Sequence, residues 1–273
     1  MPPSAMAFRS LLFVPGSRPE RFEKALGAGA DVVCIDLEDA VAPDAKDEAR
    51  RAMVAFLARP QSGRVGVRIN GATTARFVED CRALASVMTA FVMVPKVEDA
   101  SQLAETRSQL GTNGSPLWPI IESPEGLRVA WEIAAAPGVG GVLFGAADYS
   151  AEVGCTLEWD ALLYARGALA AAAARARVEL LDVPYLDLAD AEGLAITTRR
   201  AKALGFTGRA CIHPNQVGAV NAAYTPSPAE AERARRIVEA FEAAGGAAAQ
   251  LDGKLIELPV VLAARRTLER VEI

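Results

Sequence analysis

Residues 31–39 read DVVCIDLED, an uninterrupted apolar run that ends in acidic residues. Seven more runs of this kind occur in the chain, and they alternate with stretches that have helical periodicity and helix-start signals. Continuously apolar runs are typical of parallel strands that are buried on both faces. The other seven runs cover residues 10–16, 64–71, 89–98, 116–126, 139–148, 178–187 and 208–216.

Eight strands that alternate with helices predict an α/β fold, a closed (β/α)8 TIM barrel. A doubly wound open sheet is the alternative, but the GxGxxG fingerprint of that fold is missing after the first run. We assign residues 1–225 to the barrel and residues 226–273 to a C-terminal helical arm. The arm begins with SPAEAERARRIVEAFEAAGG, which carries the start and stop signals of a helix. We expect this arm to pack on a neighbouring subunit.

The composition of the 273-residue chain excludes several classes of protein. A content of 51% hydrophobic residues excludes a disordered chain, and a net charge of −5 without long blocks of one sign gives no footprint for nucleic acid. Four widely spaced cysteines without a CxxC pair favour reduced thiols. The start of the chain has no apolar run long enough for a signal peptide or a membrane span. We therefore expect a cytoplasmic protein that binds neither nucleic acid nor a membrane.

In such a barrel the chemistry lies at the carboxyl ends of the strands. These ends carry many acids, which repel one another unless a cation offsets them, and Mg²⁺ prefers carboxylate oxygens. We choose Glu122 and Asp148, on adjacent strands, as direct ligands. Taken singly, each acid also fits the first turn of a helix. The strand ends carry Asp36, Glu38, Asp39, Arg68, Asn70, Lys96, Glu98, Glu122, Asp148, Asp182, Asp187, His213 and Asn215.

Three basic residues at these ends have alternative roles. Arg68 suits bidentate capture of a substrate carboxylate, or a salt bridge to Asp36 or Glu38, and both roles are compatible. Lys96 is a candidate for a Schiff base, but neighbouring acids raise a lysine pKa, which favours a structural or electrostatic role. The only histidine, His213, excludes multi-histidine metal sites, and we interpret it as a hydrogen-bonded strand end rather than a general base.

Eight motifs along the chain, taken in order, resemble the citrate lyase beta-subunit-like branch of the HpcH/HpaI aldolase family. They are FVPGSRPERFEKA, DVVCIDLEDAVAPDAKDEAR, VRING, MVPKVE, PIIESPEG, GAADYS, ACIHPNQV and DGKLIELPVV, and the resemblance as a whole runs from about residue 9 to residue 265. The resemblance implies a (β/α)8 barrel that makes or breaks a carbon–carbon bond in acyl-CoA substrates with Mg²⁺. It also implies a homotrimer or a hexamer.

The resemblance implies roles for individual residues. Glu122 and Asp148 would bind Mg²⁺, and Asp36 would support them without touching the ion. Arg68, together with Glu122, would hold the carboxylate or carbonyl of the substrate and take part in catalysis. Arg18 would contact the CoA side of the substrate.

The C-terminal motif departs from the family pattern. Related malyl-CoA and citramalyl-CoA lyases carry an aspartate there, which is donated across a subunit interface as the acid–base group. The corresponding residue in IELP is Glu257, whose carboxylate is displaced by one methylene. Because proton transfer depends on close geometry, this change bears on the choice of substrate and on the rate. We keep Glu257 as the expected base.

The sequence thus predicts a reversible lyase for a 3-hydroxyacyl-CoA such as citryl-CoA, malyl-CoA or citramalyl-CoA. The products would be an acyl-CoA and a 2-oxo acid, namely oxaloacetate, glyoxylate or pyruvate. One alternative is a class II aldolase that uses the same Mg²⁺ chelate on free 2-keto acids. Another is a non-autonomous beta subunit of a citrate lyase complex, to which an acyl carrier protein delivers the substrate.

Overall fold

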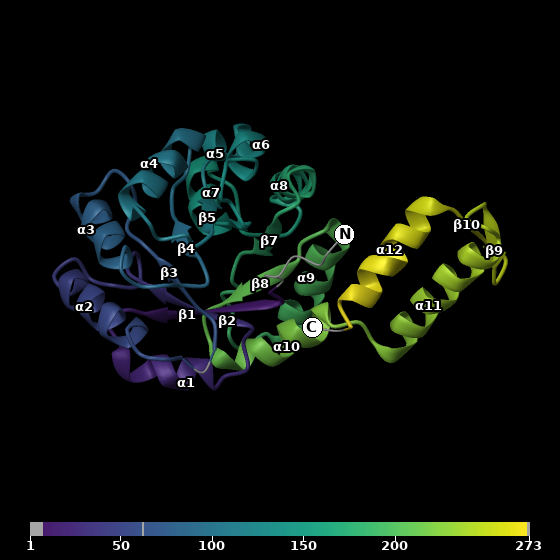
Figure 1. The fold of residues 1–273 in the computed structure, drawn as a ribbon, viewed down its shortest axis with the longest axis horizontal. Helices are drawn as coiled ribbons and strands as arrows, with labels where there is room; N and C mark the ends of the chain where they lie inside the picture. The colour runs from purple at the N-terminus through teal and green to yellow at the C-terminus, as the bar shows by residue number, and fades with distance from the viewer. Residues whose placement is uncertain (1–7, 62, 272–273) are drawn as a thin grey trace. The chain divides into compact units, whose positions relative to one another are not determined.

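The computed structural model describes residues 8–61 and 63–271. Eight parallel strands form a closed barrel, in which β1 pairs with both β2 and β8. The (β/α)8 prediction is therefore confirmed, and helices surround the barrel (Figure 1). The strands are β1 (Ser10–Pro15), β2 (Val32–Asp36), β3 (Val65–Arg68), β4 (Val92–Val94), β5 (Leu117–Ile121), β6 (Gly141–Phe144), β7 (Glu179–Asp182) and β8 (Gly208–Cys211).

Each observed strand is shorter than the run that predicted it, because the run includes the loop that follows the strand. Run 89–98, for example, contains only the three-residue strand β4 (Val92–Val94). Residues 95–98, which follow the strand, carry polar side chains at the carboxyl ends of the strands, the end of the barrel that we call the rim. Most strand residues are buried, and every residue of β2 and β5 is. This burial explains why neither run shows the alternation of a half-exposed strand.

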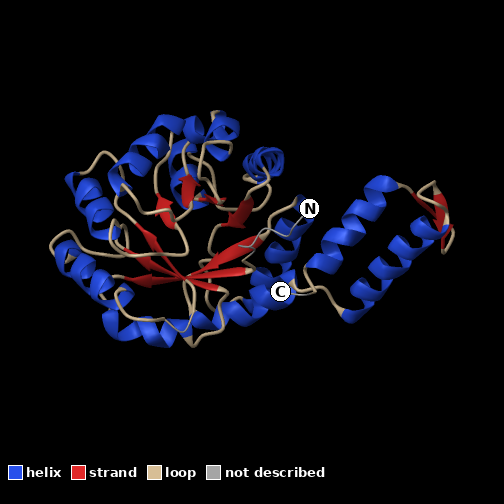
Figure 2. Cartoon of the chain, in the orientation of Figure 1, coloured by secondary structure: helices blue, strands red, loops and turns tan. Residues whose placement is uncertain are grey.

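Helices connect the strands on the outside of the barrel (Figure 2). Their starts follow local capping chemistry: Asp99 and Gln102 form a capping box at the start of α4, and Asp190 accepts a hydrogen bond from the backbone of Gly193 at α9. The helices are η1 (Pro19–Arg21), α1 (Phe22–Leu26), α2 (Lys46–Leu57), α3 (Ala75–Leu84), α4 (Ala100–Leu110), α5 (Pro124–Arg128), α6 (Ala130–Ala134), α7 (Ala146–Val153), α8 (Leu163–Ala176), α9 (Ala191–Leu204) and α10 (Pro214–Tyr224).

Three aromatic rings fill the barrel where its strands begin. Phe8, Phe91 and Trp118 are fully buried, with ring centroids 4.9 to 6.1 Å apart. Gly66 and Gly141 make room for them, since a side chain at either position would clash with the ring of Phe91 or of Trp118. We call this cluster of three rings the aromatic floor. It closes the end of the barrel opposite to the strands' carboxyl ends.

The described chain divides into two compact units, residues 8–221 and residues 222–271. In the second unit, α11 (Pro228–Ala243) starts with the capping box of Ser227 and Glu230. A hairpin of β9 (Ala249–Leu251) and β10 (Lys254–Ile256) leads to α12 (Leu258–Glu269). The two helices share a small core built around Ile237, Ile256 and Val261. Among the helices of the described residues, none has the length and apolar character needed to span a membrane.

Candidate active site

Arg68, at the end of β3, is held by the acids at the end of β2 and in the loop that follows it. Its Nε and Nη2 donate to the two carboxylate oxygens of Asp36 at 2.7 and 2.6 Å, and Nη1 lies 3.1 Å from Oε2 of Glu38. Strands β2 and β3 pair with Asp36 opposite Arg68, so the register itself brings the two side chains together. The predicted salt bridges of Arg68 to Asp36 and Glu38 are confirmed.

Lys46 fixes the loop after β2 from behind. Its ammonium donates to the carbonyls of Leu37 and Glu38 at 2.9 and 2.8 Å and to Oδ1 of Asn70 at 2.6 Å, which uses all three of its N–H donors. Asn70 in turn donates through its backbone and its side chain to the fully buried Asp80. The loop that carries the acids is therefore clamped to α2 and α3.

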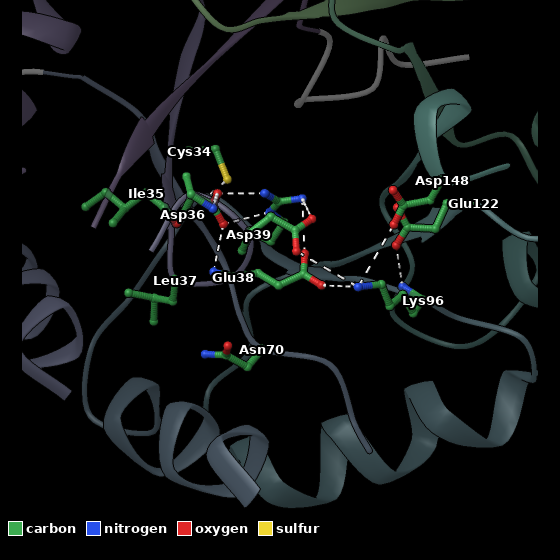
Figure 3. A network of polar contacts seen from close by, with 12 residues as sticks. Cys34, Ile35, Asp36, Leu37, Glu38, Asp39, Asn70, Lys96, Glu122 and Asp148 are labelled. Atoms are coloured by element: carbon green, nitrogen blue, oxygen red, sulfur yellow. Dashed lines mark hydrogen bonds and ion pairs between the residues drawn. The ribbon is translucent and has the colours of Figure 1, made fainter. Parts of the chain in front are cut away.

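Glu122 and Asp148 come from the ends of β5 and β6. Glu122 is 7% exposed, and Asp148 lies half exposed in the first turn of α7. Gly145 lies between β6 and α7 at a position where only glycine fits, because a Cβ there would clash with Cβ and Oε2 of Glu122. The backbone of β6 can thus pass close to Glu122. In Figure 3 both carboxylates face Lys96.

Lys96 lies between the acids of β2 and those of β5 and β6. Its backbone N–H donates to Oε1 of Glu122 at 2.7 Å, and its Nζ donates to Oε1 of Glu38 at 3.1 Å. The same Nζ is 4.0 Å from a carboxylate oxygen of Asp148. The expected electrostatic role of Lys96 fits these contacts.

The acids outweigh the cations in this cluster. Burial raises the pKa of Glu122 to about 8, and the charges of Glu38 and Asp148 add to the rise. Burial also raises the pKa of Glu38, although Arg68 opposes that shift. Burial works against the charge of Arg68, but its hydrogen bonds to Asp36 raise the pKa of the guanidinium. The carboxyl of Glu122 thus lies where another positive charge would stabilise its ionised form.

A cavity of about 430 Å³ opens above these residues. Arg68, Glu122 and Asp148 are among its lining residues, together with the apolar side chains of Phe13 and Ile212. Asp36 and Asp39 also border it. The lining of the cavity thus combines charged and apolar side chains, as small-molecule sites usually do.

The donor set fits Mg²⁺. Carboxylate oxygens are its preferred ligands, and Glu122 and Asp148 line the same cavity. Within residues 8–61 and 63–271, no three His, Cys, Asp or Glu side chains form a metal-binding group by themselves. Mg²⁺ does not need one, because it is usually bound through one or two carboxylates and keeps positions for water and substrate.

Two residues named from the family resemblance lie outside this cluster of contacts. The side chain of Arg18 is 56% exposed just after β1, 3.8 Å from Glu20. Glu257 is exposed at the start of α12, where its side chain makes no capping hydrogen bond. Their roles in binding CoA and in proton transfer stay predictions.

Not every polar strand end belongs to the rim. Asp182, at the end of β7, is fully buried and paired with Arg166 and Arg209, the first of which lies on α8, so the prediction that it joins the rim is wrong. Its side chain faces the layer of helices instead. His213 accepts a hydrogen bond from the backbone of Asn215 at 3.2 Å, in keeping with its interpretation as a hydrogen-bonded strand end.

Sequence reasoning missed Lys46 and Asp80, which hold the site without lining its main cavity. One signal was present: Lys46 opens helix α2, although the positive end of the helix dipole disfavours a cation there. A lysine in that position indicates a specific partner. Asp80 gave no such signal, because its partner Asn70 is ten residues away in another element.

The fold and the rim define a class of enzyme, the carbon–carbon lyases of the TIM-barrel fold, whose family model matches residues 173–273. The model described as HpcH/HpaI aldolase/citrate lyase matches residues 9–214, well over half of the chain. The chain belongs to the HpcH/HpaI aldolase/citrate lyase family.

Individual relatives cover nearly the whole chain. A (3S)-malyl-CoA thioesterase of Cereibacter sphaeroides is 38% identical over 98% of this chain and 96% of its own length. An L-malyl-CoA/beta-methylmalyl-CoA lyase of the same species is 34% identical over 99% and 96%. The crystal structure of the protein CitE from Mycobacterium tuberculosis, in complex with magnesium, acetoacetate and coenzyme A, has a TM-score of 0.85 at 35% identity, covering 98% of this chain and 99% of that one.

Proposed function

We propose that the chain is a Mg²⁺-dependent lyase that reversibly cleaves a 3-hydroxyacyl-CoA with a carboxylate on its hydroxyl-bearing carbon. Citryl-CoA, malyl-CoA and citramalyl-CoA have this pattern. The observation that carries the proposal is the meeting of Glu122 and Asp148 with the bidentately held Arg68 around one cavity. The products are an acyl-CoA and a 2-oxo acid.

Glu122 and Asp148 would hold the ion, whose bound form supplies a Lewis acid for the hydroxyl and carbonyl oxygens of the substrate. Arg68 orients the substrate. Because Asp36 fixes two of its nitrogens, the guanidinium meets a substrate carboxylate without having to reorganise. Asp36 supports the site in this way without contacting the ion.

The bond cleavage needs a base for the hydroxyl proton, and we assign it to Glu257. As the base takes this proton, the oxygen forms a carbonyl, the carbon–carbon bond breaks, and its electron pair moves onto the thioester as an enolate. Protonation of the enolate carbon then gives the acyl-CoA. Glu257 is exposed and its carboxylate makes no capping hydrogen bond to α12, so the carboxylate is available to accept the proton. We assign it to the site of a neighbouring subunit in a homotrimer or hexamer, and Arg18 to the CoA side.

The test is turnover of these thioesters before and after exhaustive chelation, with Mg²⁺ binding followed by calorimetry. Glu122→Gln removes a charged ligand. We expect it to weaken Mg²⁺ binding by at least the roughly 10- to 100-fold that loss of a supporting group costs, and to abolish turnover. Glu98→Gln, the same change at an exposed rim acid, is the control and should behave as the wild type. Full activity without a divalent ion would overturn the proposal.

Hydrolysis of the thioester is a second candidate, because the 38% identical relative from C. sphaeroides is named a thioesterase. Product analysis separates the two reactions. With malyl-CoA, a lyase releases acetyl-CoA and glyoxylate, whereas a thioesterase releases free CoA and malate. Turnover of a free CoA thioester would also exclude the alternative hypothesis that the chain is a beta subunit that works only when an acyl carrier protein delivers its substrate.

A further inference from the structure

Lys96 combines two unusual features, and the first is its backbone. Its φ of 55° lies in the left-handed region, which glycine adopts freely and other residues adopt at a cost. This conformation accompanies the hydrogen bond from its N–H to Glu122. Glycine would meet the backbone requirement with less strain, so the presence of a lysine indicates a use for its side chain.

The second feature is the position of its ammonium. Arg68 serves the acids of the β2 loop, and its ion pairs within the described chain are with Asp36, Glu38 and Asp39. Lys96 is the cation that also comes within 4.0 Å of Asp148, one of the two proposed metal ligands. It holds Oε1 of Glu38 at the same time, 3.1 Å away. Its side chain is 53% exposed, so it has room to move.

These contacts set two conditions for a cation on Glu122 and Asp148. The ion must enter beside a positive charge, which opposes it. In addition, Glu38 already forms ion pairs with Lys96 and Arg68, which keep this third carboxylate from becoming a ligand of the ion. A site with only two protein carboxylates keeps positions for the oxygens of the substrate.

We propose that Lys96 sets the affinity of this site for its divalent cation, weakening it so that two protein carboxylates and the substrate share the ion. The inference rests on the proposed Mg²⁺ site and goes beyond it, because it assigns a role to a residue that is not a ligand. Removing the ammonium should therefore tighten metal binding, which is the opposite of what damage to the site would do.

The experiment titrates Mg²⁺ into metal-free full-length protein by calorimetry, without substrate. Lys96→Met removes the charge, and Lys96→Gly also relieves the left-handed backbone. We expect both to bind Mg²⁺ roughly 3- to 10-fold more tightly at low salt. The gain should be smaller at high salt, because the repulsion is electrostatic and the side chain of Lys96 is about half exposed to water. Lys96→Arg keeps the charge and should stay close to wild type.

Arg82→Met is the matched control. Arg82 is an exposed cation in the last turn of α3, and since α3 runs back along the barrel, it lies near the opposite end from the rim. This variant should leave the affinity unchanged. Thermal unfolding, in which Lys96→Gly should equal or exceed wild type, verifies folding.

The outcomes separate the two proposals. If wild-type protein binds no Mg²⁺, the proposed function fails. If wild type binds Mg²⁺ and both Lys96→Met and Lys96→Gly bind it equally or more weakly while folded, the role of Lys96 is overturned.

Discussion

Arg68 offers a test at the scale of a single residue, because its paired hydrogen bonds to Asp36 need the fork geometry of the guanidinium as well as its charge. Arg68→Lys keeps the charge but loses the two parallel hydrogen bonds. Charge-assisted hydrogen bonds contribute about 1.5–3 kcal/mol, so we expect kcat/KM to fall roughly 10- to 100-fold. Steady-state kinetics with the preferred thioester measure this loss.

Arg128→Lys is the matched control for that change. Arg128 makes a similar two-pronged contact with Glu125, but on the exposed surface of α5. Exposed pairs contribute little, so this variant should keep wild-type kinetics and stability. A wild-type kcat/KM in Arg68→Lys would contradict the assignment of Arg68 as the residue that orients the substrate.

Residue by residue, the sequence predicted the rim where an acid ends a strand or follows it directly, as Asp36 and Glu122 do. It misplaced Asp182 for a physical reason. Strand β7 is buried on both faces, so its residues show no alternation that would tell which side chains face the barrel and which face the helices. Only the packing of Arg166 and Arg209 decides that the carboxylate of Asp182 points outward.

At the scale of elements, the junction of β6 and α7 is set by Gly145. A Cβ at this position would overlap Glu122, so Gly145→Ala must push either the strand end or the carboxylate away. We expect a loss of about 1–3 kcal/mol in stability, the usual cost of overpacking. Weaker Mg²⁺ binding should accompany it. Chemical denaturation and metal titration measure the two effects.

Gly167→Ala is the control for this substitution. Gly167 lies within α8 and has open space where a Cβ would go. Alanine is the better helix former, so the variant should gain about 0.5–1 kcal/mol in stability and keep its metal affinity. Unchanged Mg²⁺ binding in Gly145→Ala would show that Glu122 tolerates the displacement.

Elements with local signals were the most predictable. Helix α11 begins at Pro228 after the cap Ser227 and ends before Gly245 and Gly246, both of which have positive φ, as the sequence of the arm indicated. The link from Lys46 to the β2 loop had no comparable signal beyond the unusual position of the lysine. It joins three elements through side chains, and such contacts follow from tertiary packing rather than from local sequence.

At the scale of the whole molecule, the assignment of Glu257 to a neighbour's site predicts complementation between inactive variants. Glu122→Gln would remove a metal ligand from the subunit that carries the cavity, and Glu257→Gln would remove the base that the neighbouring subunit donates. After subunit exchange, a site should be active when its metal ligands come from a Glu257→Gln subunit and its base comes from a Glu122→Gln subunit. Random mixing of equal amounts should restore about a quarter of wild-type activity. Thioester turnover measures the recovery, and native mass spectrometry verifies that subunits have exchanged.

Either variant mixed with itself should stay inactive, which controls for the exchange procedure. If mixed oligomers form and no activity returns, Glu257 does not act across the interface. If Glu257→Gln alone keeps wild-type turnover, Glu257 is not the base.

The aromatic floor closes the barrel at the end opposite to the strands' carboxyl ends, so a ligand can enter and leave only at the carboxyl ends. In the proposed reaction, a coenzyme A thioester is far larger than the cavity of about 430 Å³. Most of it would therefore extend out of the cavity, while the oxo acid would lie deeper, against Arg68. Because Phe8, Phe91 and Trp118 fill the other end of the barrel, a bound oxo acid would have no separate exit there. We therefore expect a fixed sequence of events: the thioester product departs first, and in the synthetic direction the oxo acid must arrive before its partner.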